Sequence, residues 1–166
     1  EATQEVMTPD GWLRTGDIGY LDKNGCIFIT GRKKSMIVLT NGKKAFPEEI
    51  EYLINKVPGV KDSLVWGEDS SRGAVDICVR LMMEPDLLPE GTAKDDDGIG
   101  RYISDSIKSI NQEMPPYKAI KYFIWNQQDM IKTTTLKIKR PAETSRINSE
   151  LSKRGLNMKL RLKVLN

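Results

Sequence analysis

The hydrophobic and polar positions near the start of the chain predict two β-hairpins. Residues 18–21 and 26–30 are short apolar runs of strand character, and the turn-forming Asp-Lys-Asn-Gly at 22–25 separates them. A second, smaller hairpin is predicted because the apolar run 36–39 is followed by Asn-Gly at 41–42, a pair that fits tight antiparallel turns. This part of the chain is therefore expected to form short antiparallel strands.

After the second hairpin, the apolar residues follow the spacing of a helix. Pro47, Glu48 and Glu49 suit the first turn of a helix, where proline loses no hydrogen bond and acids complement the helix dipole. Pro58-Gly59 is expected to end the helix. The apolar face follows the helical period at Ile50, Leu53, Ile54 and Val57.

The same two periodicities predict the rest of the chain. In order, the expected elements are strands at 60–67 and 74–83, a loop at 84–98, a helix at 99–114, a strand at 120–125, a helix from Pro141 to about Lys153, and a strand-like or flexible tail at 156–165. Strands and helices in this order predict an α+β fold, with the helices packed on a small sheet.

The composition excludes several kinds of catalysis. The 166 residues include no histidine and two cysteines, so Ser-His-Asp and Cys-His chemistry and histidine-bound metals are excluded. Two cysteines alone also cannot complete a structural zinc site, and no metal site is expected. Free cysteines without an export signal favour the cytoplasm. The chain does not begin with Met, and we expect its first residues to continue a longer chain.

Charge is distributed unevenly along the chain. The net charge of +3 divides into +8 over residues 132–166 and −5 over residues 1–131. A basic C-terminal region could bind nucleic acid, an anionic membrane surface or phosphate groups. A basic helix exposed to solvent is the plain alternative, and charge alone does not choose among these.

Two candidate sites lie in the first 44 residues. Asp17 ends an Arg-Thr-Gly-Asp turn, and an aspartate held there could accept hydrogen bonds from a sugar diol; it could equally cap its own backbone. Arg32, in Gly-Arg-Lys-Lys at 31–34, offers a planar fork for phosphate or ribose oxygens. Gly42 lets the backbone approach a ligand closely. For the two basic stretches, 31–34 and 41–44, a basic hairpin exposed to solvent is the simpler alternative.

The third candidate is the lysine-rich stretch at 132–140. Lysines at positions 132, 137 and 139 are movable point charges that can follow phosphate oxygens as charge shifts during a reaction. A basic strand edge that discourages aggregation is the alternative. All three candidates suit a phosphorylated ligand that carries a ribose.

Read together, these motifs resemble the adenylate-forming enzyme superfamily and, more narrowly, its AMP-forming long-chain fatty-acyl-CoA synthetases. The resemblance rests on the order of four motifs: RTGD at 14–17, GRKK at 31–34, NGK at 41–43 followed by PEEIE at 47–51, and TLKIKR at 135–140. It covers nearly all of residues 10–150. Many other superfamily members carry proline at the place of Ile131 and glycine at the place of Leu136, and these departures fit the long-chain type.

The resemblance implies a two-step reaction and a role for five residues. ATP and a carboxylate would give an acyl-adenylate and pyrophosphate, and CoA would then displace AMP. By this resemblance Asp17 holds the ribose hydroxyls, Arg32 contacts the nucleotide and Lys34 is the hinge for domain rotation. Gly42 lines the path of pantetheine, and Lys137 is the catalytic residue that bridges the carboxylate and the α-phosphate during adenylation. ATP, CoA and Mg²⁺ belong to the full-length enzyme, and none is expected to be bound by this chain alone.

The resemblance also implies a division of the chain. Residues 1–31 would be a remnant of the large N-terminal domain, residues 32–155 a mobile C-terminal domain with a small mixed β-sheet flanked by helices, and residues 156–166 a tail. The phosphate-binding loop and the acyl pocket of the family are missing here, so the chain alone is expected not to make acyl-CoA.

Three alternatives stay open at this point. A ligase of the same superfamily for an aryl or amino acid is compatible with these residues. The +8 region could make the chain a nucleic-acid-binding module, although the stacked aromatics and glycines of single-strand binders are missing from it. Its alternating basic and apolar tail could also bring the protein to a membrane surface where fatty acids partition.

Overall fold

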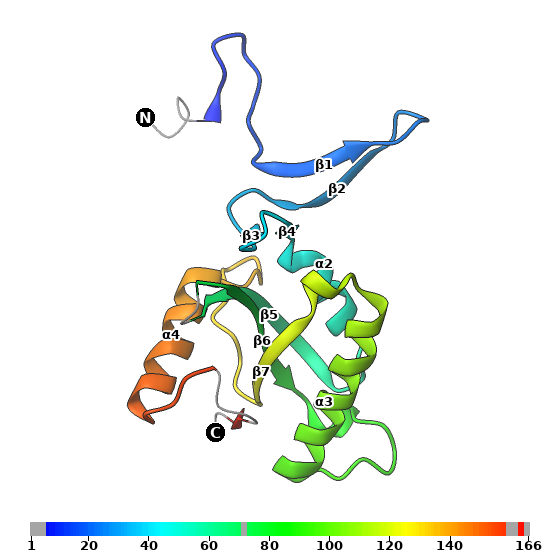
Figure 1. Cartoon of the computed structure of the whole chain (residues 1–166), viewed down its shortest axis with the longest axis vertical. Coiled ribbons are helices and arrows are strands. Elements are labelled where there is room, and N and C mark those ends of the chain that lie inside the picture. The colour runs from blue at the N-terminus through cyan, green and yellow to red at the C-terminus, as the bar shows by residue number, and fades with distance from the viewer. Residues whose placement is uncertain (1–5, 71–72, 159–162, 165–166) are drawn as a thin grey trace.

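The computed structural model describes residues 6–70, 73–158 and 163–164 of the chain. An N-terminal β-hairpin extends from an α+β body in which helices lie on both sides of a central sheet (Figure 1). The described helices include none that is both long and apolar enough to cross a membrane.

The central sheet has four strands in the order β5-β6-β7-β8. Strand β6 pairs antiparallel with β5 and parallel with β7, and β7 pairs parallel with β8, so the sheet is mixed. The prediction of an α+β fold with a small mixed sheet is confirmed. The strands span Val60–Asp69 (β5), Val75–Met83 (β6), Ile120–Asn126 (β7) and Lys163–Val164 (β8).

Three helices cover the two faces of this sheet. Helices α2 (Pro47–Ile54) and α3 (Asp96–Glu113) lie on one face, and α4 (Arg140–Lys153) lies on the other (Figure 1). Two single-turn 3₁₀ helices, Pro85–Leu87 and Pro116–Lys118, flank α3 in the crossover from β6 to β7.

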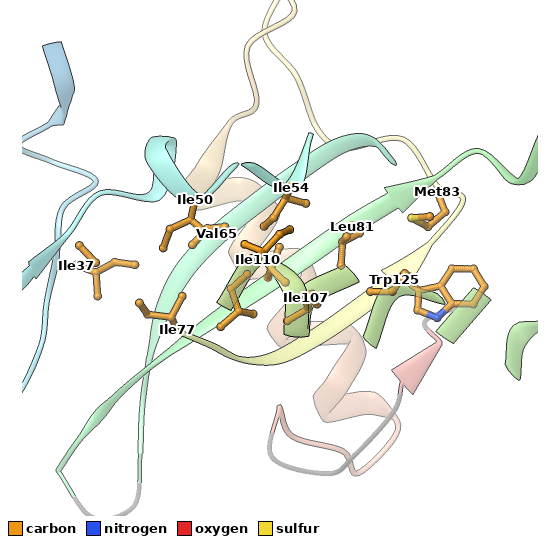
Figure 2. Close-up of a cluster of buried hydrophobic side chains, with 14 of the residues drawn as sticks. Ile37, Ile50, Ile54, Val65, Ile77, Leu81, Met83, Ile107, Ile110 and Trp125 are labelled. Carbon is orange, nitrogen blue, oxygen red and sulfur yellow. The ribbon is translucent and has the colours of Figure 1, made fainter. Parts of the chain in front are cut away.

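Strand β6 shows how the sequence assigns side chains to the two faces. Successive side chains of a strand point to opposite sides. Ile77 and Leu81 therefore join the core under α2 and α3, part of which Figure 2 shows, while Cys78 and Met82 join a smaller cluster under α4. Arg80 points to the α4 side as well and is buried there.

Helix α3 begins earlier than the sequence pattern predicts. The aspartates at 95–97 were expected in the loop, but Asp95 is the N-cap and its side chain accepts a hydrogen bond from the Gly98 amide at 2.6 Å. Asp96 and Asp97 occupy the first turn, where they complement the helix dipole. The aspartate run is thus a helix start.

The ends of two other predicted elements also differ. Helix α2 ends at Ile54, before Pro58-Gly59, because Asn55 already caps it with backbone bonds to Glu51 and Leu53. The predicted tail lies partly outside the described residues. Its first part is packed: Met158 is 4% exposed and belongs to the cluster under α4.

Both predicted hairpins near the N-terminus are confirmed. Strands β1 (Asp17–Leu21) and β2 (Ile27–Arg32) pair antiparallel, and so do the two-residue strands β3 (Ile37–Val38) and β4 (Lys44–Ala45). In the first hairpin the Asp22 carboxylate closes the turn by accepting the Asn24 and Cys26 amides, both at 2.8 Å. The second hairpin connects the first to α2.

Candidate functional site

Lys137 stands on a tight backbone turn between β7 and α4, which we call the lysine loop (residues 131–139). The turn is closed by bonds from the Thr133 amide to the Lys137 carbonyl at 2.8 Å and from the Lys139 amide to the Ile131 carbonyl at 2.8 Å. The Thr133 hydroxyl also accepts the Lys137 amide at 3.1 Å. The Lys137 side chain is exposed while its backbone is held.

Leu136 adopts an unusual backbone conformation next to this lysine. Its φ is 60°, the only positive φ at a non-glycine residue in the described chain, and its side chain is 77% exposed. Left-handed backbone costs an L-residue roughly 1–2 kcal/mol, whereas glycine adopts it freely. A glycine at this position would adopt the same turn without that cost.

A groove with a volume of about 1250 Å³ brings Lys137 together with two other predicted residues. Arg32 lines it from the end of β2, Lys34 from the turn after β2 and Lys137 from the lysine loop. Leu64 and Trp66 of β5 contribute apolar surface. Lys137 thus faces the same groove as two cationic side chains that lie more than 100 residues before it in sequence. Glu48, Glu51 and Asp62 line the groove as well, but they pair with Arg140 and Lys132, so the surface still suits an anionic ligand with an apolar or planar part.

Asp17 and Arg32 form an ion pair across the first hairpin. They are register partners in β1 and β2, and the Arg32 Nε lies 3.1 Å from the Asp17 Oδ1. The Arg32 side chain is 64% exposed and that of Asp17 is 25% exposed. The Asp17 carboxylate therefore pairs with a side chain that lines the groove, an arrangement that the sequence alone did not predict.

Lys34 lies in a turn that joins the first hairpin to the α+β body. The amides of Ser35 and Met36 both donate to the Arg32 carbonyl at 3.1 Å, which tightens this turn. The Ser35 hydroxyl donates to the Glu48 carboxylate of α2 at 2.6 Å. The turn that contains Lys34 is thus continuous with the end of β2 and is fixed to α2 through Ser35.

Arg140 connects α2, β5 and the end of the lysine loop. Its guanidinium lies 2.5 Å from Glu51 and 3.7 Å from Glu48, and donates to the Val65 carbonyl at 3.1 Å. Burial raises the pKa of Glu51, while Arg140 and the Val65 amide act against that rise. Sequence reasoning counted Arg140 only as one more basic residue, because its acidic partners belong to α2.

Gly42 lies outside the lining of this groove. It is at the tip of the β3–β4 hairpin with a φ of +75°, and its amide donates to the Leu39 carbonyl at 2.8 Å. Asn41 supports the turn by accepting the Lys43 amide at 3.0 Å, and the Lys43 ammonium lies 4.6 Å from the centre of the Tyr117 ring. Of the five predicted residues, three therefore line the groove, Asp17 pairs with one of these three, and Gly42 lies at a separate hairpin tip.

A buried charge cluster lies behind the lysine loop. Arg80 of β6 and Glu143 of α4 are in direct contact and are 2% and 0% exposed, respectively. Arg146 also pairs with Glu143, at 2.8 Å. Sequence analysis did not single out these residues; the available signal was Glu143, one of two acids among ten basic residues in the C-terminal region.

The described residues contain no group of three or more His, Cys, Asp or Glu side chains that could hold a metal ion. Mg²⁺ is usually held by one or two carboxylates together with substrate phosphates, and no step is assigned here to a metal held by this part of the chain.

Comparison with known families identifies the domain. Residues 34–153 match the family described as the AMP-binding enzyme C-terminal domain. The chain belongs to this family. The matched range holds Lys34, the β3–β4 hairpin, the central strands β5 to β7, the lysine loop and α4.

The curated proteins that this C-terminal domain is similar to are named for different substrates. The chain is 39% identical over 94 residues to mouse long-chain-fatty-acid–CoA ligase 5, covering 57% of this chain and 13% of that protein. It is 42% identical over 74 residues to the 2-succinylbenzoate–CoA ligase of Listeria monocytogenes, covering 44% and 16%. Aspergillus terreus nonribosomal peptide synthetase apvA is 50% identical over 62 residues, covering 37% and 7%. The chain thus spans less than a fifth of each of these relatives.

Solved structures share the fold of this C-terminal domain. A Mycobacterium tuberculosis fatty acyl CoA synthetase aligns with a TM-score of 0.60 at 26% identity, covering 90% of this chain and 26% of that one. The o-succinylbenzoate CoA synthetase of Bacillus subtilis, in complex with its acyl-adenylate intermediate, aligns with a TM-score of 0.63 at 22% identity, covering 85% and 26%. At its lower identity, the second match supports the fold alone.

Proposed function

We propose that the full-length protein is an AMP-forming ligase that activates a long-chain fatty acid as its acyl-adenylate and then forms acyl-CoA. Family membership and the similarity to ligases that act on acids support this proposal. The observation that carries it is the position of Lys137, held on a closed backbone turn at a groove that Arg32 and Lys34 also line. The TLKIKR and GRKK motifs favour the long-chain type of acid.

In the first half-reaction a carboxylate oxygen forms a bond to the α-phosphorus of ATP, and the bond to pyrophosphate breaks. Both reactants are anions, so a cation placed between them lowers their repulsion and stabilises the charge of the transition state. Lys137 is assigned this role. The step needs no general base because the carboxylate is already deprotonated, which agrees with a chain that has no histidine.

The other predicted residues divide between nucleotide binding and domain movement. Asp17 is assigned to the ribose hydroxyls and Arg32 to the nucleotide, and their 3.1 Å ion pair orients one against the other. Lys34, in the turn after β2, is assigned to the hinge between residues 1–31 and residues 32–155. Rotation there would replace the lysine loop by the β3–β4 hairpin, so that Gly42 lines the path of pantetheine. In this second half-reaction the CoA thiol loses its proton, its sulfur attacks the acyl carbon, and AMP is displaced.

Mutation of Lys137 tests the proposal in the full-length enzyme. Lys137→Ala is expected to slow adenylation, followed by acid-dependent pyrophosphate release, by roughly 100-fold or more, because it removes a charge that acts in the transition state. Thioester formation from a preformed acyl-adenylate is expected to stay within about threefold of the unmodified enzyme.

Lys139→Ala is the matched control, since this lysine is also exposed on the lysine loop and keeps its backbone bond to Ile131. It is expected to leave both half-reactions nearly unchanged. Equal loss of both half-reactions in Lys137→Ala would contradict the assigned role. Robust acyl-CoA synthesis by the 166-residue chain alone would show that the active site is misplaced.

A ligase for another carboxylic acid is the second candidate, because similar proteins are named for succinylbenzoate, sulfoacetate and indoleacetate. Pyrophosphate release by the full-length enzyme with a panel of fatty acids of increasing length, aryl acids and dicarboxylic acids separates the two. Preference for long chains supports the main proposal, and preference for an aryl or short polar acid replaces it.

A further inference from the structure

Glu143 contacts both ends of the lysine loop. Its Oε2 accepts the Ile131 amide at the start of the loop at 2.9 Å, and its own amide donates to the Lys139 carbonyl at the end of the loop, also at 2.9 Å. The side chain is fully buried. One residue of α4 therefore fixes the two points between which Lys137 is presented.

The charge of Glu143 is balanced from the sheet and from its own helix. Arg80 of β6 contacts the carboxylate from the buried side, and Arg146 contacts it at 2.8 Å from the next turn of α4. Burial and the charge of Arg146 lower the pKa of Arg80, and contact with Glu143 favours its charged form. Removal of Glu143 would leave a buried cation without its partner.

The same two arginines hold the chain that leads into the loop. Arg80 donates to the Asn126 side chain at 2.9 Å and to the Gln128 carbonyl at 3.0 Å. Arg146 donates to the Asp129 carbonyl at 2.8 Å. Together with the Ile131 amide, these contacts fix the path from the end of β7 to the lysine loop. Hydrogen bonds to charged groups are directional and short, so they specify position more tightly than apolar packing does.

We infer that Glu143 is a positioning residue for adenylation, which anchors the lysine loop through the Ile131 amide and thereby sets where the Lys137 ammonium stands. The inference rests on the proposed function of Lys137. Displacement of a catalytic group by about 1 Å can cost 100-fold in rate, so an anchor distant from the chemistry can control it. The role is selective: thioester formation, which does not use Lys137, is unaffected.

The anchor depends on the residue at position 131. Proline has no amide hydrogen and could not donate to Glu143. Ile131 supplies the donor in this chain. The Glu143 anchor is therefore available only to chains that lack proline at this point.

A matched pair of variants tests the anchor without a buried charge. Arg80→Met removes the cation, and in that background Glu143→Gln keeps an oxygen for the Ile131 amide whereas Glu143→Met does not. In the full-length enzyme, adenylation by the Met variant is expected to be about tenfold slower than by the Gln variant. Their rates of thioester formation from preformed adenylate are expected to agree. Amide exchange at Ile131, measured in this chain, is expected to be faster only in the Met variant.

Glu143→Asp covers the case in which these double variants do not fold. It keeps the charge but withdraws the carboxylate from Ile131, and adenylation is expected to fall about tenfold while thioester formation holds. Equal effects on both half-reactions, or no difference between the Gln and Met variants, would overturn the inference. Lys137→Ala, assayed alongside, separates the two proposals: if it acts selectively and the Glu143 variants do not, only the anchor fails.

Discussion

The face of the central sheet under α2 and α3 and the face under α4 are both closed by amphipathic helices, but different interactions fill them. Isoleucines of α3 and of the strands, with Trp125, form a continuous apolar core on the first face (Figure 2). The second face has a smaller apolar cluster and encloses the contact between Arg80 and Glu143. Apolar burial stabilises without regard to direction, whereas buried ion pairs fix positions at a cost in desolvation. The face with directional contacts is the one that supports the lysine loop.

Of the substitutions that test this contrast, one at Glu143 is expected to have the largest effect on stability. Glu143→Gln is expected to lower the free energy of unfolding by about 3–5 kcal/mol, because Arg80 is left buried without a counter-charge. Adding Arg80→Met is expected to recover most of this loss. Urea unfolding of the unmodified protein and the two variants measures both effects, and a loss below about 1 kcal/mol for the single variant would show that the pair is not a structural contact.

Truncation on the apolar face is expected to cost about 3 kcal/mol. Ile103 of α3 is 1% exposed, and Ile103→Ala removes buried methyl groups and leaves a cavity. Leu87→Ala, at a leucine that is 60% exposed, is the control and is expected to change stability by less than about 0.5 kcal/mol. The folded Ile103→Ala enzyme should keep the unmodified ratio of the two half-reaction rates. A selective loss of adenylation would break the proposed separation between the faces.

Cys78 makes the α4 face sensitive to high pH. Burial, followed by the nearby Glu68 and Asp76, raises the pKa of this thiol to about 12. The unfolded chain releases this proton nearer pH 9, so the folded state holds more protons between the two values and stability falls as pH rises through that window. By pH 10.5 this thiol is expected to have raised the folded state's free energy relative to the unfolded state by about 2 kcal/mol, which is a loss of stability. Cys78→Ala is expected to flatten the decline measured by urea unfolding from pH 8 to 10.5, and parallel declines would contradict this.

Leu136 gives the smallest expected effect. Leu136→Gly is expected to raise the free energy of unfolding by less than about 1 kcal/mol, because relief at φ 60° is partly offset by the greater freedom of glycine when unfolded. Leu136→Ala keeps the strain and is the control. A loss of stability in the glycine variant, measured by thermal unfolding, would mean that the leucine side chain makes a stabilising contact.

Local patterns predicted the secondary structure of this chain well because the residues that start, stop or pattern each element lie within it or next to it in sequence. The Asn-Gly turn at 41–42, the Pro-Glu-Glu start of α2 and the strands β5 and β6 all formed as predicted. The start of α3 was missed because three aspartates were read as loop composition, although an aspartate before an apolar helical face is itself a cap signal.

The candidate site was only partly accessible to sequence reasoning. Motifs identified Asp17, Arg32 and Lys137 as candidates, but the groove that Arg32 and Lys137 share and the Asp17–Arg32 pair depend on tertiary structure. Arg80 and Glu143 are 63 positions apart and belong to a strand and a helix that meet only in the folded domain. No periodicity connects such a pair, so a buried charge contact of this kind cannot be read from one sequence.

The parallel pairing of β6 and β7 has a consequence for the order in which the domain folds. Strand β5 ends at Asp69 and β6 begins at Val75, whereas β6 ends at Met83 and β7 begins only at Ile120, with α3 in the crossover. Closing the longer loop costs more chain entropy before its contacts compensate. The lysine loop follows β7 and is tied through Glu143 to Arg80 of β6, so its geometry is complete only after that closure.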